Sequence, residues 1–454
     1  MRKVGILVLS GLSLLALGTT PSASAADAAK DPHALKAEYN KGFRLTTADK
    51  KFQLRITAAL QYRYTYMQYD HKIKGNAEDY SNFYMRRARV WFDGYAYDPR
   101  LTYYIHVQLE PASAVNLHDA WLQYKFSDLF ALGFGRNKIP YGTEFLTSGF
   151  GLNFIERSIM YGETDINSGG GYSKWPGGNQ GFALSAEQAN TGFPVGGLCL
   201  YRSQGISATG IKHFKNGSAF QYEAGVWQGR DTKGASNGAD NHLFAARLGY
   251  YPLGWINWLT EGDVDYTENF KIGILGSAYT DSRLHNKDAA GVTVPTYKPD
   301  DNGYNVSVLT RYRGFSGDLE WGTESYDLNR NISGPTKFDR QAWRAAFGYF
   351  VVPTRIEIVA RYAQIQRLKD PTAAAVINSG LGFVPVNVDG AYVNAIEKQL
   401  NEITAGINFY FHGQQNKLFF DVSSLTRDFA DNPGVVTPSQ QKDKRFRSMI
   451  QLKF

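Results

Sequence analysis

The stretch FQLRITAALQYRYTY, residues 52–66, decides the fold class because its side chains alternate between two kinds of environment. Every even position carries an apolar or aromatic residue, and most odd positions carry Gln, Arg or Thr. A period of two is the pattern of a β-strand whose two faces meet different surroundings. These 15 residues exceed an ordinary strand of about five or six residues and suit a tilted strand that crosses a membrane. We therefore expect lipid on the even face and water on the odd face.

The same alternation returns in residues 101–110, 403–411 and 446–454, and the connections between such stretches alternate in length. Tight turns are expected at residues 215–218 and 412–415, where turn-forming residues gather. The long connections are residues 70–81, 137–179, 231–241, 283–301, 329–339, 367–396 and 430–442. Short turns on one side and long loops on the other are typical of outer-membrane barrels. We predict an all-β protein, a transmembrane antiparallel β-barrel of about 16 strands.

The N-terminus indicates export. Arg2 and Lys3 precede an apolar stretch, and the small residues Ala23-Ser24-Ala25 offer a cleavage site. We predict a signal peptide at residues 1–25, a periplasmic segment at 26–50 and an outer-membrane barrel at 51–454. The alternative for the first segment is an uncleaved signal anchor, although its apolar stretch is shorter than the roughly 20 residues that a spanning helix needs.

Composition agrees with a barrel in the lipid of a Gram-negative outer membrane. Aromatic residues make up 14% of the chain, with 46 Gly and only 16 Pro, which suits a thin apolar band around a wet interior. The single cysteine, Cys199, excludes an intramolecular disulfide. The formal net charge is +7, but the basic residues are interspersed with acids, so nucleic acid is not an expected partner. A soluble secreted β-rich binding protein remains the alternative class.

In a pore, the residues that line the lumen set which ions pass. The strand phase places thirteen basic residues on the polar face: Arg55, Arg63, Arg87, Arg89, Lys125, Arg247, Arg311, Arg313, Arg344, Arg355, Arg361, Arg445 and Arg447. Eight acids fall on the same face: Asp93, Glu110, Asp119, Glu223, Glu320, Glu324, Glu357 and Asp421. The excess of basic groups favours anions, since a positive lining concentrates them and arginine binds oxyanions in a bidentate manner. The alternative is that acids pair with these arginines and brace the wall.

The connection at residues 137–179 has roughly forty residues, far more than a simple hairpin loop needs. This length favours a functional role. Residues 111–115 form an unusually short second loop on the same side, so residues 137–179 are the third. We predict that this third loop folds into the lumen and narrows the pore; an external loop is the alternative. Arg87, Arg89, Arg136 and Arg157 are expected near the narrowest part. The Trp-rich segment 255–270 is expected to be a longer turn.

Four motifs occur in order: YMRRAR at residues 84–89, DAWLQY at 119–124, GRNKIPYGTE at 135–144 and IER at 155–157. Together they resemble the phosphate-selective porin O and P family of Gram-negative outer membranes. The C-terminal residues 450–454 are similar to the assembly signal of outer-membrane barrels generally.

The resemblance implies a homotrimer of sixteen-stranded barrels, each with its own pore. It also implies that arginines, including the pair Arg86 and Arg87, lead anions such as phosphate or other oxyanions to a constriction that contains a lysine. Lys138 and Glu144 lie in the motif that begins this constriction loop. The chain departs from phosphate-selective members at Phe145, where they carry a lysine.

Phe145 supports an alternative porin, with a general or different selectivity, that passes uncharged or aromatic solutes. In that reading Phe145, Tyr141, Trp121 and Trp91 stack against the solute, whereas the simpler role of these rings is packing or an interfacial girdle.

An enzyme would need a nucleophile and a base held together. The eight histidines show no such local partnership: no Gly-x-Ser-x-Gly elbow accompanies His106 or His118, and the sequence contains no HExxH or CxxC motif. We therefore expect no enzyme activity, cofactor or metal, and we expect the partners to be small solutes or ions.

Overall fold

The computed structural model describes most of the chain beyond residue 30. The described residues are 31–32, 34–68, 70, 79–109, 115–161, 198, 200–229, 242–281, 285–287, 293–297, 300–327, 337–366, 383–388, 391–430 and 439–454. The predicted signal peptide lies outside them, and so does the predicted loop from residue 162 onward. Within the described ranges, no helix is both long and apolar enough to cross a membrane.

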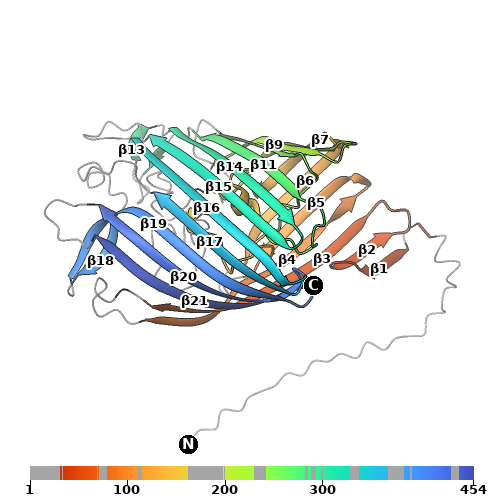
Figure 1. The fold of residues 1–454 in the computed structure, drawn as a ribbon. Coiled ribbons are helices and arrows are strands. Elements are labelled where there is room, and N and C mark those ends of the chain that lie inside the picture. The colour runs from red at the N-terminus through yellow and green to blue at the C-terminus, as the bar shows by residue number, and fades with distance from the viewer. Residues whose placement is uncertain are drawn as a thin grey trace, which may run out of the picture.

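Sixteen strands form a closed antiparallel barrel (Figure 1). They are β3 (Gln53–Gln68), β4 (Tyr80–Ala96), β5 (Asp98–Gln108), β6 (Asn116–Ser127), β7 (Phe130–Lys138), β8 (Arg202–His213), β9 (Ala219–Trp227), β10 (Leu243–Tyr251), β11 (Lys271–Asp281), β14 (Asp300–Tyr312), β15 (Phe315–Asp327), β16 (Lys337–Val352), β17 (Ile356–Gln366), β19 (Ala391–Tyr410), β20 (Asn416–Ala430) and β21 (Gln440–Lys453). The last strand pairs with the first, from Lys444 opposite Gln68 to Lys453 opposite Ala59, and this closes the sheet. The predicted fold class is confirmed.

Five further strands lie outside this ring. β1 (Leu35–Tyr39) and β2 (Phe43–Thr47) form a hairpin, and β2 pairs with the start of β3. β12 (His285–Lys287) pairs with β13 (Thr293–Tyr297), and β18 (Phe383–Val388) pairs with the first part of β19. Figure 1 shows β13 and β18 at one end of the barrel and the β1–β2 hairpin at the other. The hairpin lies within the predicted N-terminal segment, residues 26–50, for which no strand was expected.

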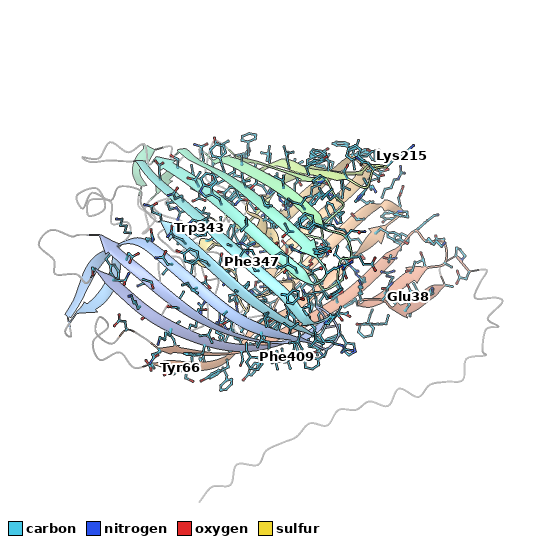
Figure 2. The ribbon with its side chains drawn as sticks, in the orientation of Figure 1. Glu38, Tyr66, Lys215, Trp343, Phe347 and Phe409 are labelled. Atoms are coloured by element: carbon cyan, nitrogen blue, oxygen red, sulfur yellow. The ribbon has the colours of Figure 1, made fainter. Side chains whose placement is uncertain are left out.

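The alternation in the opening stretch separates the two faces of the wall. On β3, Gln61 and Arg63 are buried, whereas Leu60 and Tyr62 are 40% and 47% exposed. In a barrel wall, buried residues face the interior and exposed apolar residues meet the surrounding lipid. Figure 2 shows the same outer surface on β16, where it labels Trp343. The predicted division between an apolar outer face and a polar inner face is therefore confirmed.

Tight turns join the strands at the end of the barrel that carries the hairpin. Figure 2 shows Lys215, in the turn between β8 and β9, at the same end as Glu38 of β1. Arg313 and Gly314 alone join β14 to β15, and their φ angles of 45° and 84° are both positive. Two positive φ angles match the right-handed twist of a hairpin, and glycine adopts one of them without strain. The turns predicted at residues 215–218 and 412–415 are also present.

Among the β-bulges of the described strands, one on β4 and one on β6 change which residues face inward. On β4, Gln61 is opposite Arg87 but Tyr62 is opposite Met85, so Arg86 is the extra residue. On β6, the register shifts in the same way around His118. A bulge can turn two consecutive side chains to one face. Arg86 and Arg87 are consequently both buried in the interior, as are His118 and Asp119.

Candidate functional site

Residues 139–161 follow β7 and contact the inward-facing side chains of strands across the barrel. They include the single-turn helix α3 (Thr143–Leu146) and the 3-10 turn η1 (Ile159–Tyr161), and nearly all of them are buried. The backbone N–H of Thr143 donates to Glu320 on β15, and that of Ile159 donates to Glu402 on β19, at 3.0 Å. On β3, the Gln61 side chain donates to the carbonyl of Gly149. We call residues 139–161 the inner segment.

Glu156 ties the inner segment to the paired-arginine strand. Its carboxylate lies 3.0 Å from a guanidinium nitrogen of Arg63 and 3.1 Å from nitrogens of Arg86 and Arg87. Burial would raise the pKa of Glu156, but the guanidinium groups of Arg86, Arg87 and Arg63 hold it well below its usual range. Three guanidinium groups therefore pair with the Glu156 carboxylate, which joins β3 and β4 to the inner segment.

On the opposite wall, carboxylates pair with the arginines and offset their positive charge. Arg344 lies 3.0 Å from Glu320, and Arg361 lies 2.6 Å from Glu402. Glu144 accepts a hydrogen bond from the Ser158 N–H at 2.9 Å and lies near both arginines. For Arg344 and Arg361, the contacts match the wall-bracing role that the sequence left open.

The connection between β10 and β11 also reaches the inner segment. The Thr147 hydroxyl donates to the carbonyl of Trp258 at 2.9 Å, and the Asn153 N–H donates to the Glu261 carboxylate at 2.8 Å. Glu261 in turn pairs with Arg344 at 3.2 Å. The predicted longer turn is therefore present, and its contacts hold the inner segment from a second side.

A cavity of about 510 Å³ lies between the inner segment and the wall formed by β4 to β9. Its charged lining residues are Arg87, Arg89, Lys138, Arg157 and Arg202, with the acids Asp119 and Glu223. With neutral histidines, these groups sum to 5 − 2 = +3. We call this space the basic cavity.

A second cavity of about 420 Å³ adjoins the basic cavity. Gln123, Thr209, Glu223, Trp258 and Leu259 line both spaces. The second cavity continues to Lys125 and to Asp128 in the tight turn after β6. The two spaces together follow the inner faces of β6, β8 and β9 toward the end of the barrel that carries the tight turns.

Phe145 occupies the position at which the sequence departs from the family pattern. Its ring is buried, and the charged ends of Lys138 and Arg157 lie 5.1 and 5.4 Å from the ring centre. Lys138 donates to the carbonyls of Phe145, Leu146 and Thr147 at 2.6, 2.9 and 3.2 Å. The short helix α3 thus holds both cations at the cavity. Phe145 packs against them, whereas the lysine of phosphate-selective members would add a third positive charge.

A cluster of histidines and charges forms the wall of the basic cavity at β5, β6 and β8. His106 lies 2.8 Å from Asp119, which also accepts a hydrogen bond from Arg202 at 2.7 Å, and Arg89 lies 3.2 Å from His118. The ligand atoms of His106, His118 and Asp119 lie within 4.8 Å of one another, so their residue types could hold a metal ion. The guanidinium groups of Arg89 and Arg202 disfavour a cation here, because they are positive and already contact these ligand atoms.

The predicted site residues fall into three groups. The basic cavity gathers Arg87, Arg89, Asp119, Lys138, Phe145 and Arg157. The ion-paired interior outside the cavity lining holds Arg63, Arg86, Glu144, Arg311, Arg344 and Arg361. Toward the tight turns, Arg55 pairs with Asp93 and Lys125 pairs with Asp128.

Arg136 is the exception among the residues expected at the narrowest part. The register places it opposite Ala120, one residue from the cavity-lining pair Trp121 and Gly135. Arg136 itself is not among the described residues that line the cavity. The structure does not bring Arg136 into the basic cavity.

Sequence reasoning missed Arg202 and Trp258 as cavity residues. Arg202 starts β8 opposite Lys138, a pairing that depends on register across a long connection. Trp258 lies in the turn between β10 and β11, whose inward path has no periodic signal. The signal in the sequence that could have identified Trp258 is the tryptophan-rich composition of that turn.

Comparisons with known proteins identify the type of barrel. The family model described as phosphate-selective porin O and P matches residues 56–253. Among solved structures, an anion-selective porin from Comamonas acidovorans has 10% sequence identity and a TM-score of 0.50, over 88% of this chain and 99% of that chain. OprB from Pseudomonas putida, in a high-pH structure, has 11% identity and a TM-score of 0.50, over 88% of this chain and 94% of that one. No curated protein sequence matches.

Proposed function

We propose that the channel prefers small anions, phosphate or other oxyanions, over cations, as the match of residues 56–253 to the phosphate-selective porin O and P family model suggests. The protein is a channel-forming porin of the Gram-negative outer membrane, and its family and fold are those of a channel and not of an enzyme. The preference among solutes is the part that the proposal adds.

The charge of the basic cavity carries this proposal. Five basic and two acidic side chains line it among the residues that the structure describes, and their formal charges sum to 5 − 2 = +3 with neutral histidines. A positive lining between low-dielectric walls raises the local concentration of anions. Guanidinium groups such as Arg89 also match the geometry of oxyanions better than ammonium groups do.

We further propose that the predicted loop at residues 137–179 folds into the lumen and narrows the pore. The contacts of its described part support this, since the inner segment binds inward-facing residues of β3, β4, β15 and β19. The space left for permeation then lies along β4 to β9, where the basic cavity is found. The remaining residues of the loop lie outside the described part of the chain.

Planar-bilayer recording under a potassium chloride gradient tests the selectivity. We expect a reversal potential of the sign that chloride permeation gives, because the narrow part is positive. A reversal potential that indicates cation preference would refute the proposal. The same recordings test the homotrimer that the family resemblance implies: one insertion event should close in three equal steps, and a single closing step would contradict that assembly.

A further inference from the structure

The basic cavity has an aromatic wall as well as a positive charge. Trp91, Tyr104 and Trp121 come from the adjacent strands β4, β5 and β6 and all line it. Tyr104 and Trp121 stack with ring centres 5.4 Å apart and planes at 17°, and Trp91 stacks on His106 at 4.9 Å. These rings form a continuous surface across three strands, which we call the aromatic panel.

The inner segment and the turn after β10 extend this aromatic lining. Phe150 meets Trp91 edge to face, with ring centres 5.3 Å apart. Phe145 and Trp258 also line the cavity. A planar solute in the cavity would therefore meet rings contributed by the wall and by both inserted connections.

The basic residues lie along the same wall as the panel. Arg89 is two residues before Trp91 on β4, and Arg202 pairs with Asp119, two residues before Trp121 on β6. Alternation gives residues two apart the same face of a strand. The cavity thus presents cationic groups on the same inner surface as the ring panel.

This arrangement exceeds what a small inorganic anion requires. The face of an aromatic ring is negative, so the panel adds nothing favourable for phosphate or chloride. A ring on the solute, in contrast, can stack on the panel while its anionic group lies among the arginines. A volume of about 510 Å³ is within the usual range for small-molecule sites, about 300–1,000 Å³.

We propose that the basic cavity is a binding site for aromatic carboxylates, which the channel passes by transient stacking on the aromatic panel. This inference rests on the proposed anion preference and names a class of organic anion within it. Binding at such a site has to remain weak enough for the solute to leave, as in other selective pores.

Block of the chloride current by added benzoate in planar bilayers tests the inference. Cyclohexanecarboxylate carries the same charge on a non-aromatic ring of similar size, and acetate carries the charge alone. We expect half-block by benzoate at a concentration about tenfold lower than by cyclohexanecarboxylate, because ring stacking adds to the affinity. Equal half-block concentrations for the two ring acids would overturn the inference.

Variants of the panel locate the site. Trp121→Leu should raise the half-block concentration of benzoate about tenfold relative to acetate, and Trp121→Phe should retain most of the wild-type affinity. If Trp121→Leu does not insert, Tyr104→Leu gives the same test on the neighbouring strand. Trp321→Leu is the matched control, since Trp321 is 44% exposed on the outer face of β15, and its block should equal that of the wild type. Wild-type block by benzoate in both panel variants would also overturn the inference.

The two proposals fail in different ways. A channel that prefers cations in potassium chloride alone refutes the proposed function, whatever benzoate does. A channel that prefers chloride but binds benzoate no better than acetate refutes only the aromatic site.

Discussion

Replacing Arg89 and Arg157 together with glutamate is expected to turn the channel from anion preference to cation preference. Each substitution changes the charge of the basic cavity by two, so the lining goes from +3 to 3 − 4 = −1. The reversal potential under a potassium chloride gradient should change sign, with a change on the order of tenfold in the ratio of anion to cation permeability. Arg157→Glu alone leaves +1 and should only weaken the preference.

Arg136→Glu is the matched control for this experiment. It makes the same change of charge, but Arg136, opposite Ala120 in the register, is not among the described residues that line the basic cavity. Its reversal potential should remain that of the wild type. A double variant that still prefers anions, or an Arg136 variant that shifts as far as Arg157→Glu, would show that the basic cavity does not set the selectivity.

Glu156→Gln is expected to destabilise the barrel by about 3–5 kcal/mol, because it removes the negative charge that pairs with three buried guanidinium groups. Arg63, Arg86 and Arg87 are all buried against Glu156, and their ion pairs link β3 and β4 to the inner segment. Urea unfolding of the reconstituted protein, followed by tryptophan fluorescence, measures the loss.

Glu38→Gln provides the control for the stability measurement. Glu38 also pairs with two basic groups, Lys36 and Arg44, but on the exposed hairpin at the end of the barrel. Exposed ion pairs contribute little, since water and salt screen them. The unfolding midpoint of Glu38→Gln should stay close to that of the wild type. If Glu156→Gln also unfolds at the wild-type midpoint, the ion pairs of Glu156 do not stabilise the barrel.

The wall could be predicted from the sequence because alternation is a local property. Leu60, Tyr62, Gln61 and Arg63 face the sides that the opening stretch predicts. The sequence also predicted that Arg87, Arg89 and Arg157 lie near one another, and all three line one cavity. Phe145 also lines that cavity, where its ring packs against the charged ends of Lys138 and Arg157.

The remaining features depend on how distant strands pair, and local patterns do not contain that information. A bulge at Arg86 or His118 exists only relative to the register of the neighbouring strand. The same limit applies to Arg136, whose motif position suggested the constriction although it is not among the described residues that line the basic cavity. Arg202 reaches the cavity only through its pairing with β7.

Thiol modification at a matched pair of threonines most directly tests the central claim that solutes pass through the basic cavity. Thr209 lines both cavities, whereas Thr404 also faces inward but is buried against Glu402 and Ser423. In a Cys199→Ser background, a negatively charged methanethiosulfonate reagent should strongly reduce the chloride current of Thr209→Cys and leave that of Thr404→Cys unchanged. The opposite pattern, with block at position 404 and none at 209, would place the pathway on the other side of the inner segment and contradict the account.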